Sequence, residues 1–231
     1  MIIAIDGPAG AGKSTVARQV AARLGFSYID SGAMYRALAL ACREVGLNAD
    51  CDNEQIIELA FQLPLHFEDN GTRIFIGERD VSVPIRASHM GEATSQIAAI
   101  GKVRPAMVAQ QQRLGREGQS NCGGAVLEGR DIQTVVFPDA ELKIFLTATP
   151  NTRASRRIGD WRNQQQGQQQ EIDLAQLERE IEERDERDSS RKDSPLKAAE
   201  DAVILATDDL SVEEVIEKIV ALAHEKSKGN L

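Results

Sequence analysis

The sequence predicts an α/β fold built around a central parallel sheet. A short apolar run at residues 2–5 suits a buried parallel strand, a glycine-rich loop and an alanine-rich amphipathic helix follow it, and a second short strand comes next. Strand, loop, helix and strand in this order open an α/β fold. The chain has 231 residues, 42% of them hydrophobic, which is enough for one domain with a substantial core.

The first elements follow from apolar periodicity and from glycines that end helices. We expect a helix at Ser14–Leu24, a strand at Phe26–Ile29 and a helix at Ala33–Val45.

Residues 50–90 have a different pattern, which predicts a helix at Asn53–Gln62 and a small hairpin. The hairpin strands are Leu65–Glu68 and Arg73–Gly77, around Asn70-Gly71, a strong turn signal. Glu92–Gly115 is predicted to be helical, with Pro105 near the start of a separate segment. We therefore interpret residues 31–119 as an insertion that carries its own small sheet.

The rest of the chain predicts three more strands and two more helices. The strands are Ala125–Leu127, Leu142–Thr147 and Val203–Ala206, and the helices are Ile172–Arg187 and Ser211–His224. Ser211 and Glu214 have the spacing of a capping box. The glutamine-rich stretch from Arg162 to Gln170 is polar enough to predict a mobile loop.

Composition restricts the class of protein. The net charge of −9 argues against general nucleic-acid binding, which relies on a positive field. Cys42, Cys51 and Cys122 form no CxxC pair and no metal-like spacing with the histidines, so we expect reduced thiols in a cytoplasmic protein. No apolar run approaches the length of a membrane span, and the N-terminus lacks the features of a signal peptide.

Residues Gly7–Ser14 match the phosphate-loop pattern GxxxxGK[ST] in full, between the predicted strand and helix. The glycines let backbone N–H groups turn towards phosphate oxygens, and the helix presents its positive N-terminus to the same anion. Lys13 is placed to reach the β- and γ-phosphates, and the Ser14 hydroxyl to ligate Mg²⁺. This segment therefore predicts binding of a nucleoside triphosphate.

A phosphate loop does not name the reaction, because GTPases, motor ATPases and small-molecule kinases share it. The chain has no Asn-Lys pair, so it lacks the NKxD motif that reads guanine, and it is short for a motor. Small-molecule kinases remain, and these need a second anion site for the acceptor.

Arginines supply candidates for this second site. Arg36 follows the second strand, and Arg130-Asp131 follows the strand Ala125–Leu127, so both reach the carboxyl edge of the sheet, where open parallel sheets bind ligands. Arg184, Arg187 and Arg191 share one face of a helix with Asp188. The alternative for this helix is a solvated surface with internal salt bridges.

Several motifs in order resemble the bacterial cytidylate kinases, P-loop nucleoside monophosphate kinases that act on CMP and dCMP. They are the phosphate loop, Asp30-Ser31-Gly32-Ala33-Met34-Tyr35-Arg36, Glu128-Gly129-Arg130-Asp131 with Thr134-Val135-Val136-Phe137-Pro138, and Glu183-Arg184-Asp185 with Arg187-Asp188. The resemblance covers residues 1–220. It implies a three-layer P-loop kinase fold with an inserted NMP-binding subdomain at 31–119, which contains a small antiparallel sheet, and a mobile lid at 151–175.

The resemblance also implies roles for individual residues. The catalytic residues would be Lys13 with Arg153 and Arg157 from the lid cluster that includes Arg156. ATP would bind at Gly7, Pro8, Ala9, Gly10, Ala11, Gly12, Lys13, Ser14 and Thr15, with Mg²⁺ at Ser14. The acceptor phosphate would contact Arg36 and Arg130, the cytosine Ser95, Arg104, Asp131 and Arg191, and the ribose Ser31, Arg184 and Asp188.

Two features depart from the family pattern: Gln133 stands where glycine is usual, and the lid carries the glutamine-rich run. We expect a monomer that uses Mg²⁺, ATP and CMP or dCMP, without nucleic acid or membrane partners. Two alternatives stay open: a kinase for another nucleoside monophosphate or small acceptor, and a nucleotide-binding switch without turnover.

Overall fold

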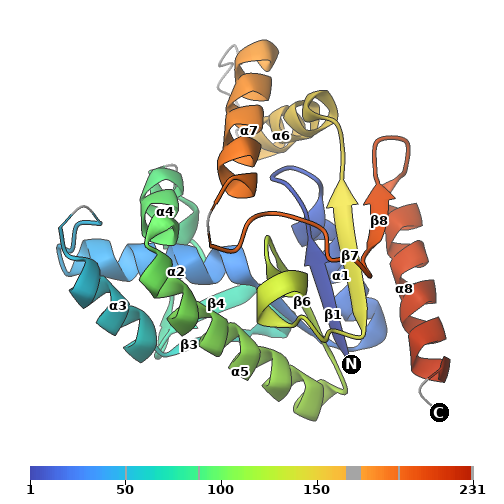
Figure 1. Cartoon of the computed structure of the whole chain (residues 1–231), viewed down its shortest axis with the longest axis horizontal. Coiled ribbons are helices and arrows are strands. Elements are labelled where there is room, and N and C mark those ends of the chain that lie inside the picture. Colours follow the sequence, from blue (N-terminus) through green and yellow to red (C-terminus); the bar gives the residue numbers. More distant parts are fainter. Residues whose placement is uncertain (50, 88, 165–172, 192, 230–231) are drawn as a thin grey trace. The chain divides into compact units, whose positions relative to one another are not determined.

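The computed structural model describes residues 1–49, 51–87, 89–164, 173–191 and 193–229, whose strands form two sheets (Figure 1). The larger sheet has the strand order β2-β6-β1-β7-β8, and the pairs β2–β6, β1–β7 and β7–β8 run parallel. The predicted α/β fold is therefore confirmed, and the predicted strand ends differ from those observed by two residues at most. The strands are β1 (Ile2–Asp6), β2 (Ser27–Asp30), β6 (Ala125–Gly129), β7 (Leu142–Thr147) and β8 (Val203–Ala206).

The chain forms two compact units, one of residues 1–2 and 21–129 and the other of residues 3–20 and 130–231. In the first unit, α5 packs on β2 and β6, and α2 packs on α4. The Asp30 carboxylate caps α2 by accepting from the Ala33 N–H at 2.9 Å. The helices are α2 (Ser31–Glu44), α3 (Asn53–Gln62), α4 (Met90–Ala99) and α5 (Arg104–Cys122).

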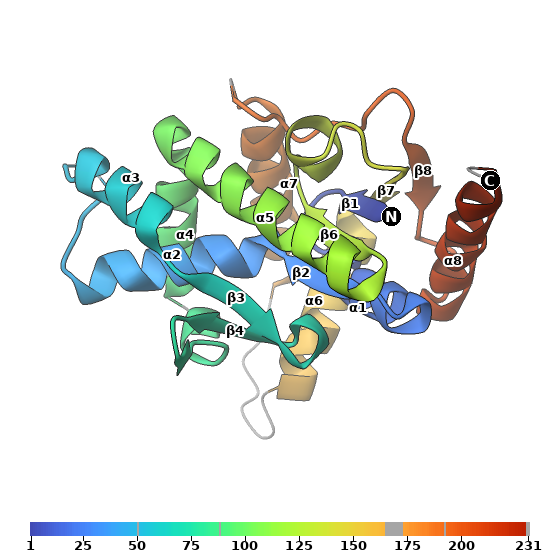
Figure 2. The ribbon, with the colours of Figure 1, turned by 90° about the horizontal axis from the view of Figure 1, so that it is seen from below.

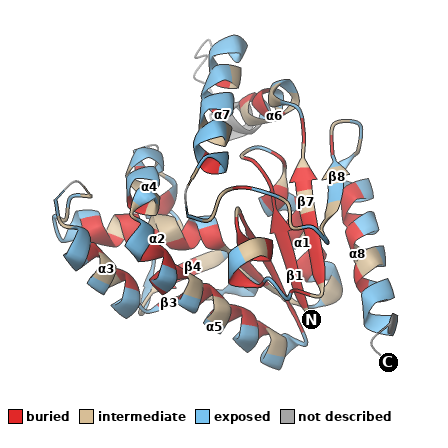
Figure 3. Ribbon diagram, viewed as in Figure 1, coloured by how far each residue is buried: buried red, intermediate tan, exposed pale blue. Residues whose placement is uncertain are grey.

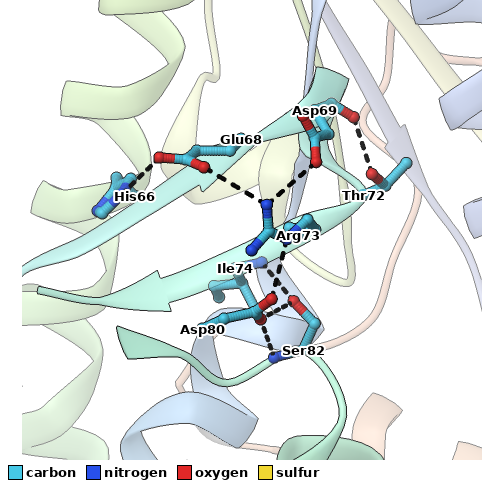
Figure 4. A network of polar contacts seen from close by, with 8 residues as sticks. All are labelled: His66, Glu68, Asp69, Thr72, Arg73, Ile74, Asp80 and Ser82. Carbon is cyan, nitrogen blue, oxygen red and sulfur yellow. Dashed lines mark hydrogen bonds and ion pairs between the residues drawn. The ribbon is translucent and has the colours of Figure 1, made fainter. Parts of the chain in front are cut away.

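The first unit also holds the small sheet, which confirms the predicted hairpin and adds a third, two-residue strand. Its strands, β3 (Leu65–Glu68), β4 (Arg73–Ile76) and β5 (Arg79–Asp80), are antiparallel, and β4 packs against α2 (Figure 2). Exposed charges join them: the Arg73 guanidinium bonds Asp80 at 2.9 Å and Asp69 at 3.4 Å (Figure 4). Because these groups are exposed, their contribution to stability is small.

The predicted helical range Glu92–Gly115 is divided between two helices. The helix α4 ends at Ala99, a 3₁₀ turn follows at Gly101–Val103, and α5 begins at Arg104. Pro105 lacks an N–H and is tolerated in the first turn of a helix, where that donor has no partner within the helix. The expectation of a separate segment starting near Pro105 is therefore confirmed.

The second unit contains β1, the loop after it and the start of α1 (Lys13–Leu24), followed later by a π-helical turn at Ile132–Val136. Helices α6 (Pro150–Gln164) and α7 (Leu174–Ser189) pack together through an apolar cluster. The cluster consists of Ala154, Ile158, Leu177 and Ile181. Sequence reasoning missed α6 and the π-helical turn. Residues 165–170 of the glutamine-rich stretch, and Ile172, lie outside the described residues.

The last helix, α8 (Val212–Gly229), packs against β7. Its capping box is confirmed: the Ser211 Oγ accepts from the Glu214 N–H at 3.2 Å, and the Glu214 carboxylate accepts from the Ser211 N–H at 2.8 Å.

Every residue of β1 is buried, as expected for a parallel strand (Figure 3). No helix in the described ranges is long and apolar enough to cross a membrane.

Candidate active site

The phosphate loop connects β1 to α1 in the second unit. Gly7 has φ +150°, and a Cβ at this position would lie 2.0 Å from the Leu146 carbonyl oxygen on β7. Gly10 has φ +79°, and a Cβ there would lie 3.0 Å from the Cβ of Arg153. The loop therefore needs glycine at both positions, for its backbone conformation and for its close approach to β7 and α6.

The two reactive side chains of the loop differ in exposure. Lys13 is buried, and its Nζ donates to the Pro8 carbonyl at 2.7 Å, which fixes the ammonium group against the phosphate loop. Ser14 and Thr15 are exposed at the first turn of α1, where helix N–H groups lack partners within the helix. This arrangement combines a fixed cation, an exposed hydroxyl and a positive helix end around one loop.

Asp6, the last residue of β1, is a buried acidic residue next to the phosphate loop that sequence reasoning did not single out. Its carboxylate is fully buried and accepts from the backbone N–H groups of Ile132 at 3.1 Å and Gln133 at 2.8 Å. Burial raises the pKa of Asp6 to about 6, against the opposing effect of these two hydrogen bonds. The only signal in the sequence was an acidic residue directly between an apolar strand and the loop.

Arg130 and Arg191 share the carboxylate of Asp188 in the same unit. The Arg130 Nε donates to Asp188 Oδ2 at 3.0 Å, and the Arg191 Nη2 donates to Oδ1. Asp188 is buried near the end of α7, whereas both arginines are partly exposed. The carboxylate therefore orients two guanidinium groups. Arg184 lies one turn earlier on α7 and is half-buried.

The three arginines of the predicted lid cluster have different surroundings. Arg153 is buried: its Nη1 lies 3.1 Å from the Ala9 carbonyl of the phosphate loop, and it forms an ion pair with Asp185 on α7. Arg156 donates to the Thr207 carbonyl at 2.6 Å, and Arg157 is half-buried on α6. Arg153 therefore lies against the phosphate loop, whereas Arg156 bonds to Thr207, the residue that follows β8.

The first unit carries four more of the predicted site residues. Ser31 begins α2, is buried, and donates to the Glu128 carbonyl at 2.6 Å, while Arg36 is half-buried one turn later. Ser95 is exposed on α4, with its hydroxyl bonded to the Gly91 carbonyl at 3.1 Å. Arg104 is buried at the start of α5. These residues lie on α2, α4 and α5, all in the first unit.

A separate hollow of about 540 Å³ lies between the end of α2 and the start of α4, and no predicted site residue lines it. Its lining includes Cys42, whose thiol pKa is raised to about 11 by burial. This thiol is therefore protonated at neutral pH.

The family model for cytidylate kinase matches residues 3–225. The chain belongs to the cytidylate kinase family. It is 46% identical to the cytidylate kinase of Exiguobacterium sibiricum over 96% of each chain. It is also 51% identical to the bifunctional pantoate ligase/cytidylate kinase of Nostoc sp. strain PCC 7120, over 95% of this chain but only 40% of that protein.

A solved structure supports the fold alone. The shikimate kinase of Bacteroides thetaiotaomicron superposes with a TM-score of 0.50 at 14% identity, covering 97% of this chain and 98% of that one. The chain therefore has the fold of P-loop small-molecule kinases and, by sequence, belongs to the cytidylate kinase family.

Proposed function

We propose that the protein transfers the γ-phosphoryl group of ATP to CMP and dCMP, giving ADP and CDP or dCDP. The most direct support is that one unit contains both a complete phosphate loop and Arg130, an arginine held by a buried carboxylate. A loop of this kind suits a triphosphate, and an oriented guanidinium suits a second phosphate. Membership of the cytidylate kinase family supplies the acceptor.

For ATP, we propose that the loop N–H groups and the start of α1 bind the phosphates, with Lys13 on the β- and γ-oxygens. The exposed hydroxyl of Ser14, at the end of the loop, fits a ligand of Mg²⁺, an ion that prefers oxygen donors and usually arrives with the nucleotide. Bound there, Mg²⁺ would offset phosphate charge. The complete ATP set is Gly7, Pro8, Ala9, Gly10, Ala11, Gly12, Lys13, Ser14 and Thr15.

For the acceptor, we propose that Arg36 and Arg130 bind the phosphate. An acceptor phosphate oxygen is already anionic at neutral pH, so the reaction needs positioned cations and no general base. The proposed base contacts are Ser95, Arg104, Asp131 and Arg191, and the ribose contacts are Ser31, Arg184 and Asp188.

We further propose that Arg153 and Arg157 stabilise the transferring phosphoryl group when residues 151–175 close as a lid, excluding water that could accept it. For Arg153, this role requires that its guanidinium exchange Asp185 for a phosphate oxygen. Residues 31–119 would be the NMP-binding segment of a single, monomeric kinase domain. A cytoplasmic location accords with the free thiols Cys42, Cys51 and Cys122.

One assay tests this function: ADP release coupled to a reporter, with MgATP and CMP, dCMP, UMP, AMP or no acceptor. We expect release that depends on CMP or dCMP. Preference for AMP would overturn the acceptor, and ATP binding without acceptor-dependent release would point to a switch.

A further inference from the structure

The carboxylate of Asp6 connects the phosphate loop to the turn that carries Arg130 and Asp131. Asp6 directly precedes Gly7, and its two oxygens accept from the consecutive N–H groups of Ile132 and Gln133. All of these residues belong to the second unit. One buried side chain therefore fixes the end of β1 and the first two amides of the turn together.

The turn itself transmits this constraint to the one or two residues that precede it. Asp131 has φ −141° and precedes the π-helical turn, and its carbonyl accepts from the N–H groups of Val135 at 2.9 Å and Val136 at 3.2 Å. Arg130 stands two residues before Ile132, whose amide is held by Asp6. Because π-helical turns are rare and often occur at functional sites, the arrangement is more than a generic loop. A shift of these amides would move both proposed substrate contacts.

The side chain of Gln133 also holds this turn. Its Oε1 accepts from the Ala199 N–H at 3.0 Å, and its Nε2 lies 3.4 Å from the Ile144 carbonyl on β7. The glycine usual at this position has no side chain for these contacts. In this chain, the turn is therefore fixed both by the carboxylate of Asp6 and by the amide of Gln133.

The choice of a carboxylate at position 6 has a chemical reason. Two converging N–H donors need two acceptors, which an ionised carboxylate supplies, whereas asparagine would turn an NH₂ donor towards one of them. Burial disfavours the charge, and the neighbouring charge of Asp131 disfavours it further. Retaining a charge here suggests a requirement beyond packing.

We propose that Asp6 is a positioning residue that sets Arg130 and Asp131 relative to the phosphate loop. This inference rests on the proposed function, because it assumes that these two residues contact the acceptor. Asp6 itself touches no substrate; it acts through the turn.

The kinetic test is Asp6→Asn, with Asp209→Asn as the matched control at an exposed carboxylate in the same unit. We expect Asp6→Asn to raise the KM for CMP about 10-fold, which corresponds to about 1.4 kcal/mol of lost binding energy. The KM for ATP should change less than about 2-fold. The control should change neither constant. An equal rise in both KM values, or no rise in either, would overturn the inference.

A second measurement uses the unmodified protein and needs no activity, so it decides the matter even if Asp6→Asn does not fold. Between pH 5 and 8, NMR should show the N–H signals of Ile132 and Gln133 and the Nε–H of Arg130 titrating together, with a midpoint near 6. If Arg130 does not follow the amides, Asp6 does not position it. If it follows but CMP supports no ADP release, the proposed function fails and the coupling stands.

Discussion

The guanidinium of Arg153 lies 2.5 Å from the Oδ2 of Asp185, so a side chain that touches the phosphate loop is held by the helix that carries Arg184 and Asp188. Arg153 is buried, and the Asp185 Oδ1 is buried without a hydrogen-bond partner among the residues that the structure describes. The pair therefore ties α6 and α7 to the phosphate loop at Ala9.

Replacing Asp185 with asparagine should destabilise the protein by about 1–3 kcal/mol, because it leaves a buried guanidinium without its counter-charge. Urea unfolding measures the change. Glu186→Gln, the exposed neighbour on α7, is the control and should shift the free energy of unfolding by less than about 0.5 kcal/mol. Equal stabilities for the two variants would mean that the ion pair contributes nothing.

Lys13→Ala should lower kcat by at least about 100-fold with the fold intact, because a fixed cation at the transferring phosphoryl group accounts for a loss of that order. The coupled assay gives kcat, and circular dichroism checks the fold. Lys218→Ala, at an exposed position on α8, should retain normal kcat. Near-normal turnover in Lys13→Ala would contradict the proposed role of the phosphate loop.

Arg36→Gln and Arg130→Gln should each raise the KM for CMP about 10-fold or more, since a charge-assisted hydrogen bond is worth about 1.5–3 kcal/mol. The KM for ATP should stay within about 2-fold of its normal value. Initial rates with each substrate varied in turn provide both constants. Arg179→Gln, exposed on α7, is the control. A rise in the KM for ATP alone would show that the donor and acceptor sites were assigned the wrong way round.

The preference for cytosine over uracil tests the proposed role of Asp131, which is buried directly before the π-helical turn. Cytosine presents an N4 amine to a carboxylate and acceptors to arginines, whereas uracil presents the opposite pattern, so each mismatched group costs about 1–3 kcal/mol. We expect kcat/KM for CMP to exceed that for UMP by at least about 10-fold. Asp131→Ala should reduce this ratio by harming CMP more than UMP. An unchanged ratio would mean that Asp131 does not read the base.

The stability of the protein should report the ionisation of Asp6. Its pKa is about 6 in the folded protein and near 3.8 when unfolded, so the folded state binds the proton more tightly. The contribution of Asp6 to the free energy of unfolding should therefore fall as pH rises from about 4 to above 6. The fall is up to about 3 kcal/mol, since one pKa unit is worth about 1.4 kcal/mol.

The difference between wild type and Asp6→Asn isolates this contribution, because other titrating groups cancel. Urea unfolding at several pH values should show wild type losing stability relative to the variant between pH 4 and 7. A difference that is constant with pH would show that Asp6 does not titrate in this range. Together with the expected rise in the KM for CMP, the predicted trend would separate a positioning role from a stabilising one.

Local patterns predicted the larger elements of the fold. The apolar run of β1, the glycines of the loop and the capping box of α8 are encoded within a few residues, so their structure follows from backbone and side-chain preferences. Within the predicted helical range Glu92–Gly115, Pro105 marked the start of a separate segment, because a residue without an N–H is tolerated in the first turn of a helix. The helix α6 was missed because arginines and a polar run obscure its apolar stripe of Ala154 and Ile158.

The sequence by itself determined the family, the phosphate loop and the candidate residues of the acceptor site, because these depend on motifs of fixed spacing. Only the tertiary structure decided how the charges are arranged. Asp6 meets Ile132 and Gln133 across 126 and 127 positions of the chain, as the hydrogen bonds of its carboxylate show. Arg153 is held by Asp185, and Arg130 by Asp188. No local pattern specifies such pairs, because each forms only when distant segments fold together and burial makes an unpaired charge costly.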